Sequence, residues 1–471
     1  YTFTRDTTTA TPTLSLASDT GSSATDKITN VGVVNVTGLE TGAVWNYSLD
    51  NGATWNAGTG TTFTVANAAD VNSVTRTVKV QQTDLAGNTA TSSGFEFTLD
   101  AKGPTAATLS LPSDTGTSNT DNITKVGTVN VGGLESSATW TYSTNGGVTW
   151  NAGSGTAVTL TGDGAKTVVV RQTDLSGNVS EVSSAYTFTR DTTTATPTLS
   201  LASDTGSSAT DKITNVGVVN VAGLEAGAVW RYSLDNGTTW NAGTGTTFTV
   251  ANSGGDNAVA RTVKVEQTDL AGNVATSSGF TFTLDAAGPA QASLALASDS
   301  GTSDADRYTN TGTVNLTGLE AGATWTYSTN GGVTWNAGSG TAVTLTGDGA
   351  KTMVVRQTDV AGNTSVSSTS LGFTLDTAVA APTVALTTDS GTSSTDKITN
   401  ALGLTVSGRE ASVTSLGTVQ GTIEYKVGTD AWTTTAPTGL ADGSKSVLVR
   451  QTDAAGNVSA ASSALVFTYD T

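Results

Sequence analysis

The sequence contains no cysteine and no histidine, and its 471 residues include only one methionine and seven prolines. Zinc, haem and iron–sulfur centres use Cys or His in almost every known arrangement, so the sequence predicts none of them. Ser-His-Asp and Cys-His catalysis are excluded for the same reason. No disulfide can stabilise the fold, and cysteine usage gives no indication of the redox compartment.

Positive charge and long apolar runs are also scarce. Lys and Arg number 21 against 39 Asp and Glu, which gives a formal charge of −18. A chain this acidic repels phosphate, so nucleic acid is not expected as a partner. The apolar runs are too short to span a membrane, and the chain does not open on a signal peptide.

The sequence is instead repetitive, and three motifs recur along it. The first, SDTG with the variants SDSG and TDSG, carries Asp19, Asp114, Asp204, Asp299 and Asp389. The second, QTDxxGN, carries Asp84, Asp174, Asp269, Asp359 and Asp453. The third is a strand-like segment that ends in an acid, at Asp100, Asp191, Asp285, Asp376 and Asp470. These motifs predict five repeats, at 7–100, 101–191, 192–285, 286–376 and 377–470.

Two further features concern the order of the repeats. Residues 1–6 (YTFTRD) match 186–191, which predicts that they are the last strand of a preceding repeat in a much longer protein. The sequence from Tyr1 also returns almost unchanged from Tyr186, so the repeats alternate between two types. Prolines mark the start of each repeat, as expected of linkers that lead into an edge strand: Pro12, Pro104, Pro197, Pro289 and Pro382.

Apolar residues within a repeat alternate with polar ones, which indicates strands rather than helices. The alternation predicts strands at 13–18, 31–39, 44–50, 76–84 and 91–99, with two more in the middle. Asp50-Asn51-Gly52, Asn56-Ala57-Gly58 and Ala86-Gly87-Asn88 are predicted turns with positive φ. About seven strands in roughly 90 residues are typical of an Ig-like β-sandwich. The predicted fold is all-β, a tandem array of Ig-like sandwiches in an elongated rod of about 150–200 Å.

The acidic residues are concentrated at recurring positions. Five positions in each repeat, together with Asp6, account for 26 of the 39 acids. The positions in repeat 1 are Asp19, Asp26, Glu40, Asp84 and Asp100. Their equivalents outside the motifs above are Asp121, Glu135, Asp211, Glu225, Asp306, Glu320, Asp396 and Glu410.

The antiparallel strand order assigns these acids to the two ends of each sandwich. Asp19, Asp26 and Asp100 are expected at the C-terminal pole of repeat 1, and Glu135 and Asp174 at the N-terminal pole of repeat 2. The linker is short, so we expect all five carboxylates at one junction, where they would repel one another unless a cation lay among them. A hard cation that takes about six to eight oxygen ligands is calcium, whereas magnesium demands stricter octahedral geometry. All 26 acids are therefore candidate calcium ligands.

A simpler alternative applies to each Asp taken alone. An Asp in Asp-Thr-Gly or Thr-Asp-x-x-Gly-Asn can cap a turn through its own side chain. Glu40 and its equivalents suit this role poorly, because their side chain is too long. The joint pattern over five repeats favours calcium, and turn capping remains the alternative.

The motifs together resemble a known family. The strings LSLASDTGSSATDKITN, VNVTGLE, WNYSLDNGATWNAGTG and QTDLAGN are similar to the bacterial Ig-like repeats of giant adhesins. The resemblance implies type I secretion, an RTX-type C-terminus and a place at the bacterial cell surface. It also implies an extender: a rod stiffened by calcium between neighbouring repeats, holding a distant tip for adhesion or biofilm formation. No GGxGxDxUx nonapeptide, retention module or tip domain is recognisable.

Repeat 5 departs from the pattern. Glu410 lies 15 residues before Tyr425, whereas Glu40 lies 7 before Tyr47, so this loop of repeat 5 carries 8 extra residues. Ile423 also replaces the Trp found at position 45. The longer loop is expected to face the junction with repeat 4.

Enzymatic interpretations fit the repeats poorly. Asp-Thr-Gly and Asp-Ser-Gly occur in aspartic proteases, but there two such loops meet in one cleft. Here each copy stands in a separate domain. Glycoside hydrolysis by paired carboxylates meets the same objection, so we expect no enzyme.

Two other binding functions remain open. The Trp pairs, such as Trp45 and Trp55, predict one core residue and one partly exposed residue, and the second could stack on surface glycans. The unpaired first strand could make the chain a subunit of an extracellular filament or surface layer. The Thr-rich faces are those of any exposed sheet and give no specific indication of ice binding.

Overall fold

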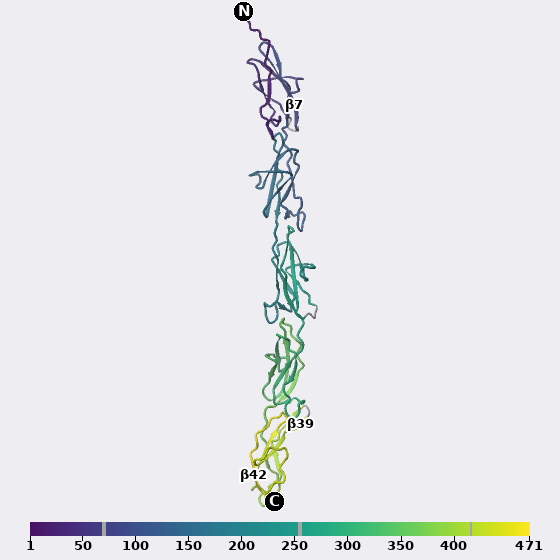
Figure 1. Ribbon diagram of the computed structural model, residues 1–471, viewed down its shortest axis with the longest axis vertical. Helices are drawn as coiled ribbons and strands as arrows, with labels where there is room; N and C mark the ends of the chain where they lie inside the picture. Colours follow the sequence, from purple (N-terminus) through teal and green to yellow (C-terminus); the bar gives the residue numbers. More distant parts are fainter. Residues whose placement is uncertain (68–71, 253–256, 415–416) are drawn as a thin grey trace.

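The computed structural model describes residues 1–67, 72–252, 257–414 and 417–471. The repeats follow one another in single file, with the N terminus at one end of a long rod and the C terminus at the other (Figure 1). The described residues form strands, turns and bends without any helix. Among them there is accordingly no apolar helix of membrane-spanning length.

Repeat 1 shows the arrangement of strands. Its strands are β1 (Thr13–Leu16), β2 (Ile28–Thr29), β3 (Val33–Thr37), β4 (Val44–Ser48), β5 (Asn56–Ala57), β6 (Thr62–Thr64), β7 (Val74–Thr83), β8 (Thr89–Thr91) and β9 (Phe95–Leu99). One sheet has the order β1-β3-β6, and the other has the order β2-β9-β7-β4-β5 with β8 beside β7. The sheets enclose the core between them, which confirms the predicted Ig-like sandwich.

Repeats 2, 3 and 4 keep this order in both sheets. Repeat 2 has β10 (Thr108–Ser110), β11 (Ile123–Thr124), β12 (Thr128–Gly132), β13 (Thr139–Ser143), β14 (Asn151–Ala152), β15 (Ala157–Thr159), β16 (Gly164–Thr173) and β17 (Tyr186–Arg190). Repeat 3 has β18 (Thr198–Leu201), β19 (Ile213–Thr214), β20 (Val218–Ala222), β21 (Val229–Ser233), β22 (Asn241–Ala242), β23 (Thr247–Thr249), β24 (Val259–Thr268), β25 (Val274–Thr276) and β26 (Phe280–Leu284). Repeat 4 has β27 (Ser293–Leu296), β28 (Tyr308–Thr309), β29 (Thr313–Thr317), β30 (Thr324–Ser328), β31 (Asn336–Ala337), β32 (Ala342–Thr344), β33 (Gly349–Thr358) and β34 (Leu371–Leu375).

Repeat 5 differs by an inserted hairpin. Its strands are β35 (Thr383–Leu386), β36 (Ile398–Thr399), β37 (Leu404–Ser407), β38 (Ala411–Thr414), β39 (Gly417–Gln420), β40 (Thr422–Val427), β41 (Gly443–Thr452) and β42 (Leu465–Tyr469). The extra residues of the predicted long loop form the antiparallel pair β38–β39, apart from 415–416, which lie outside the described residues. Figure 1 places β39 at the boundary between repeats 4 and 5.

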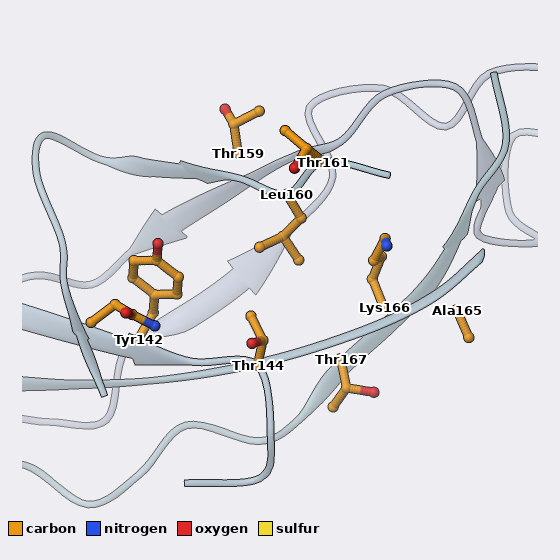
Figure 2. Close-up of a pocket in the computed structure, with 9 residues that line it drawn as sticks. Tyr142, Thr144, Thr159, Leu160, Thr161, Ala165, Lys166 and Thr167 are labelled. Carbon is orange, nitrogen blue, oxygen red and sulfur yellow. The ribbon is translucent and has the colours of Figure 1, made fainter. Parts of the chain in front are cut away.

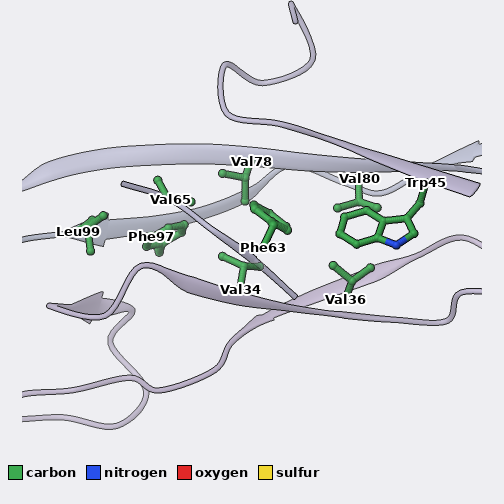
Figure 3. Close-up of a cluster of buried hydrophobic side chains, with 9 residues drawn as sticks. All are labelled: Val34, Val36, Trp45, Phe63, Val65, Val78, Val80, Phe97 and Leu99. Atoms are coloured by element: carbon green, nitrogen blue, oxygen red, sulfur yellow. The ribbon is translucent and has the colours of Figure 1, made fainter. Parts of the chain in front are cut away.

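The core of each sandwich follows from the alternation in its strands. In repeat 1, Val34 and Val36 of β3 are almost fully buried and face Val78 and Val80 of β7 across the core (Figure 3). Trp45 closes one end of this core, and its indole nitrogen donates a hydrogen bond to the Gly60 carbonyl. The burial of these apolar faces is what stabilises each repeat, because no disulfide is present.

The predicted strand 91–99 is interrupted, because β8 ends at Thr91 and β9 begins at Phe95. Two further local expectations differ from the structure. Asn56 and Ala57 form the short strand β5 rather than a turn, and Gly58 does not have positive φ. A Cβ at Gly58 would lie 2.3 Å from the Trp45 ring, so glycine is needed there for packing. The other difference is β2, a strand too short for alternation to reveal, which pairs in parallel with β9.

Residues 1–6 are described without a strand, and Tyr1 and Phe3 are exposed. The prediction that they form the last strand of a preceding repeat stays a prediction.

The Trp pair of repeat 2 allows a matched test of the core. Trp140 is 6% exposed, whereas Trp150 lies on the surface beneath the Arg171 guanidinium. We expect Trp140→Ala to lower the free energy of unfolding of repeat 2 by about 3–5 kcal/mol, because it leaves a large cavity. Trp150→Ala should cost about 1 kcal/mol or less. Hydrogen exchange of repeat 2 in the full chain measures both, and equal losses of protection would contradict this assignment of the core.

Candidate metal centres at the repeat junctions

The QTDxxGN loop connects each repeat to the end of the preceding one. In repeat 2 the Asp174 carboxylate is 8% exposed and accepts hydrogen bonds from the backbone and side-chain nitrogens of Asn178, at 2.8 and 2.9 Å. The same Asn178 side chain donates to the backbone carbonyl of Asp100, the last residue of repeat 1, at 2.9 Å. The equivalent pairs, with the Asn as donor, are Asn88–Asp6, Asn273–Asp191, Asn363–Asp285 and Asn457–Asp376.

The Gln of this motif is a functional residue that the sequence interpretation missed. Gln172 is fully buried, and its side-chain nitrogen donates to the carbonyls of Thr105 in the linker and Gly133 after β12. Its side-chain oxygen accepts the backbone N–H of Glu135 at 2.8 Å, which fixes the start of the Glu loop. A signal was present, since a Gln precedes Thr-Asp in every copy of the motif. The equivalents are Gln82, Gln267, Gln357 and Gln451.

A close approach of two glycines sets the distance between neighbouring repeats. A Cβ at Gly21, in the SDTG loop of repeat 1, would lie 1.9 Å from the Leu175 carbonyl oxygen of repeat 2. A Cβ at Gly177 would lie 3.0 Å from the Gly21 nitrogen. Beside this contact the Thr20 hydroxyl donates to the Ser176 carbonyl at 2.7 Å. The same approach occurs at Gly116–Gly272, Gly206–Gly362 and Gly301–Gly456.

Carboxylates from neighbouring repeats gather beside these contacts. Within the described residues, three groups have carboxylate oxygens that all lie within 4.8 Å of one another. Each combines the terminal Asp before a repeat with the Glu and the QTDxxGN Asp of that repeat. The groups are Asp6–Glu40–Asp84, Asp191–Glu225–Asp269 and Asp376–Glu410–Asp453. The donors are all oxygens, which suits a hard cation such as calcium.

The linker of each repeat distinguishes these groups from the two other sets, Asp100–Glu135–Asp174 and Asp285–Glu320–Asp359. Ala10 donates its backbone N–H to the Glu40 carboxylate, and Ala195 does the same to Glu225. In repeats 2 and 4 the linker residues that accept the Gln amide, as Ala10 does in repeat 1, are Thr105 and Ala290, and each directly follows a proline. The linkers that contain these prolines are one residue longer between the terminal Asp and the first strand. The junctions therefore alternate between two linker types.

The acids of the SDTG loop reach the same junctions but lie outside the three groups. Asp19 accepts the backbone N–H of Lys27, and Asp26 accepts that of Ile28, both at 3.0 Å. The other carboxylate oxygen of Asp19 is buried and accepts no hydrogen bond from any described residue. The same holds for Asp114, Asp204, Asp299 and Asp389. A buried carboxylate oxygen without a donor is a position that a cation can satisfy.

The predicted gathering of five carboxylates is therefore only partly observed. The SDTG-loop acids belong to none of the three groups, and Asp100, Glu135 and Asp174, the acids expected together at the junction of repeats 1 and 2, do not form such a group among the described residues. Turn capping, the simpler alternative for each Asp, also occurs. The backbone N–H groups that cap Asp19, Asp26, Asp84 and Asp100 occupy part of their acceptor capacity. Capping and cation binding are compatible, because a carboxylate has about four lone-pair sites.

The pKa values of two Glu side chains reflect the crowding of negative charge. Partial loss of hydration raises the pKa of Glu320, although the residue as a whole is exposed, and the charges of Asp359 and Asp285 raise it further. Burial also raises the pKa of Glu410, with further contributions from Asp376 and Asp453. Both shifts disfavour the ionised Glu at these junctions, and a bound cation would reverse that effect.

The hollows on the sides of the sandwiches differ in whether they reach these acids, and one in repeat 4 is lined in part by Asp299 and Asp304. One in repeat 2, of about 440 Å³, is lined by Tyr142, Leu160, Lys166 and several Thr side chains (Figure 2). None of its lining residues is Asp or Glu. It therefore supplies no carboxylate pair.

The surface Trp residues differ in their surroundings. An Arg guanidinium lies over the ring of Trp150, Trp240, Trp335 and Trp432. In repeat 1 the positions of these Arg residues are taken by Gln81, equivalent to Arg171, and Asn46, equivalent to Arg231, and Trp55 is 37% exposed.

Gly21 and Gly391 give a matched test of the junction contact. Both have positive φ, 96° and 116°, so alanine is strained at either position. Only Gly21 meets a neighbouring repeat, since the nearest atom to a Cβ at Gly391 is Ile398 O at 3.9 Å. We expect Gly21→Ala to displace repeat 2 and shorten the maximum dimension in small-angle X-ray scattering. Gly391→Ala should leave it unchanged, and a shortening by both variants would contradict the contact.

Comparison with known proteins identifies the domain. The family model of the bacterial Ig-like domain matches residues 287–377 and 378–471. No curated protein matches the sequence.

Several solved structures are similar at low identity. A tetra-tandem repeat from the extending region of a large adhesion protein shares 16% identity, covering 78% of this chain and 100% of that one, with a TM-score of 0.28. A structure concerning host cell surface retention of a 1.5-MDa bacterial ice-binding adhesin shares 21%, covering 57% and 98%, with a TM-score of 0.26. The FN1–FN3 domains of chicken CNTN1 share 12%, covering 58% and 99%, with a TM-score of 0.25.

Repeats 1 to 3 have the same motifs and the same strand order as repeat 4, which lies in the part of the chain that the family model matches. The chain is a tandem array of Ig-like β-sandwiches, and its last two repeats match the bacterial Ig-like domain.

Proposed function

We propose that this chain is an extender segment of a bacterial surface adhesin, stiffened by calcium bound between neighbouring repeats. It would project a distal binding domain away from the cell for adhesion or biofilm formation. The observation that carries the proposal is the contribution of carboxylates from two neighbouring repeats to one group, as at Asp191, Glu225 and Asp269. A cation bound there would contact both repeats at once.

The effect of calcium on stiffness follows from electrostatics. Without a cation, the carboxylates at a junction repel one another across the linker, which favours separation of the two repeats. A bound calcium ion replaces that repulsion with ligand bonds to both sides. Each repeat has its own core, so calcium acts mainly on the alignment between repeats.

The SDTG loops supply a second set of candidate ligands at each junction. The buried oxygen of Asp19 lies in a loop that contacts the next repeat through Thr20 and Gly21. A cation bound by this oxygen would order the loop and strengthen that contact. Extracellular calcium is millimolar, which matches modules that bind with dissociation constants of about 10⁻⁴–10⁻³ M. This agrees with a place outside the cell.

Carbohydrate binding is the alternative that one observation supports. Trp55 is an exposed ring on the surface of repeat 1, with no Arg over it among the described residues. Exposed aromatic rings of this kind stack on apolar faces of ligands. A glycan array with Trp55→Ala as control tests this alternative. Loss of a glycan signal in the variant would favour it.

Small-angle scattering of the full chain tests the extender proposal. With calcium we expect a maximum dimension on the order of 150–200 Å. Chelation should shorten it, because repelling junctions bend. Glu225→Gln should weaken the response to calcium, whereas Glu96→Gln, on the exposed face of β9, should not. A maximum dimension that is the same with calcium and with chelator would overturn calcium stiffening.

The raised pKa of Glu320 predicts that its replacement by Gln has opposite effects on the thermal stability of repeat 4 with and without calcium. A raised native pKa means that the unfolded state gives up the proton at a lower pH than the native state does, so repeat 4 loses stability as pH rises from the unfolded pKa towards the native one. In chelator at pH 7, Glu320→Gln should therefore raise the thermal midpoint of repeat 4, and the gain should vanish as pH falls below about 4, where Glu is neutral in both states.

With saturating calcium the order should reverse, since Gln removes a charged ligand. Differential scanning calorimetry of the full chain measures both conditions, with Glu96→Gln as the exposed control. A variant that is destabilised to the same extent with and without calcium would show that Glu320 has only a structural role.

A further inference from the structure

The junction between repeats 4 and 5 contains an element that the described parts of the other junctions lack. The hairpin β38–β39 begins directly after Glu410, a member of the carboxylate group at this junction. Its base is closed by the backbone N–H of Gly421, which donates to the Glu410 carbonyl at 2.8 Å, and by Arg409, whose Nε donates to the Gly421 carbonyl. The hairpin is therefore anchored at the position where the two repeats meet.

Tyr308 of repeat 4 lies between the hairpin and the carboxylate group. Its hydroxyl donates to a carboxylate oxygen of Asp376 at 3.1 Å. Burial raises the pKa of Tyr308; the nearby Ser412 hydroxyl of β38 opposes that rise, and the charges of Asp376 and Glu410 add to it. Ser412 is itself 3% exposed. The other repeats have isoleucine at this position, as Ile28, Ile123, Ile213 and Ile398.

Burial of the neighbouring acid shows that this end of repeat 4 is covered. Asp306 is 3% exposed, whereas Asp26, Asp121, Asp211 and Asp396 are exposed. The SDTG loops that carry these acids have nearly the same sequence. The repeats that follow repeats 1, 2 and 3 have the short loop in place of the hairpin. The covering of Asp306 thus goes together with the insertion.

The linker between repeats 4 and 5 is also held from the repeat 4 side. Thr377 donates both its backbone N–H and its hydroxyl to one carboxylate oxygen of Asp348, at 3.0 and 2.7 Å. At the junctions before repeats 2 and 4 this linker position is Ala101 or Ala286, which has no hydroxyl. The junction between repeats 4 and 5 therefore has a held linker and a covering hairpin together.

We propose that hairpin β38–β39 and Tyr308 form a lock that keeps repeats 4 and 5 aligned without a cation. The lock rests on the proposed function, because it specifies which junctions of the extender depend on calcium. Its contacts are made by protein groups alone, and the Tyr308 hydroxyl supplies a charge-assisted hydrogen bond to an acid that would otherwise repel its neighbours. Chelation would then bend the rod at the junctions without the hairpin, while repeats 4 and 5 move as one body.

Distances between spin labels on neighbouring repeats test the lock. The sequence has no cysteine, so spin labels attach only to the cysteines that are introduced in pairs. Equivalent exposed positions on the first strands of neighbouring repeats are Ser200, Ala295 and Ala385. The pair Ser200→Cys with Ala295→Cys spans the junction between repeats 3 and 4. The pair Ala295→Cys with Ala385→Cys spans the proposed lock. Double electron–electron resonance on the full chain measures each distance distribution with calcium and with chelator.

We expect chelation to broaden the distribution across repeats 3 and 4 at least twofold, and to leave that across repeats 4 and 5 unchanged. Equal broadening at both junctions would overturn the lock and leave calcium stiffening intact. No broadening at either junction would instead contradict calcium stiffening, and a lock specific to repeats 4 and 5 with it. The two proposals therefore fail in distinguishable ways.

Three variants test whether the named residues make the lock. Tyr308→Phe removes the hydroxyl alone, and Tyr308→Ile restores the residue of the other repeats; either should let chelation broaden the distance between Ala295→Cys and Ala385→Cys. Replacing 411–421 by Thr-Gly-Ala, the sequence of 41–43, removes the hairpin and should have a larger effect. Calorimetry with calcium establishes that repeat 5 remains folded in each variant. Distributions that stay narrow in chelator in every folded variant would overturn the proposal.

Discussion

The close backbone contact between Gly21 and Gly177, repeated at the later junctions, is the constraint on which the rest of the rod depends. Neither glycine leaves room for a side chain, so the SDTG loop of one repeat and the QTDxxGN loop of the next meet in a single way. Hydrogen bonds from Thr20 and Asn178 then fix the orientation of the two loops. Together these contacts hold the carboxylates of two domains within reach of each other.

The carboxylates oppose the contact that positions them. The glycine approach brings negative groups together, and partial loss of hydration makes ionisation of Glu320 and Glu410 less favourable. Such a junction is sensitive to the ions around it. Uncharged groups make the contacts that set its geometry, whereas the free energy of that arrangement depends on the charged carboxylates. The neutral contacts determine how the repeats meet. The acids determine under which conditions that arrangement is stable.

The sequence predicts the sandwich well because its main cause is local. Alternation in segments such as Val33–Thr37 reports directly on which side chains face the core. The strand β2 has only two residues, Ile28 and Thr29, and its pairing with β9 depends on a distant segment. The reason for glycine at position 58 is also non-local. The Trp45 ring leaves no room for a side chain there, whereas the φ of Gly58 does not require glycine.

The candidate site was predictable in its residues more than in its grouping. The recurrence of acids such as Glu135 and Asp174 identifies them as junction residues through strand order alone. Asp19 lies outside the three-carboxylate groups and accepts a hydrogen bond from the Lys27 backbone N–H. The recurrence of the motif along the sequence does not reveal this hydrogen bond. The role of the buried Gln172 is not evident from charge, because its neutral amide acts through a hydrogen bond to a backbone carbonyl of the linker. The role of Tyr308 depends on the next repeat, because Ser412 and Glu410 of repeat 5 lie near the Tyr308 hydroxyl, which is bonded to Asp376 of its own repeat.

The alternation between Ala10-type and Pro104-type linkers also has a consequence for how the protein is made. Tandem domains that emerge one after another from the ribosome are prone to exchange strands with neighbours of the same sequence. Here the near-copies, such as the segments from Tyr1 and from Tyr186, are separated by a repeat of the other type. Each newly synthesised domain thus folds beside a partner that differs from it, which disfavours misassembly while the chain keeps a uniform architecture.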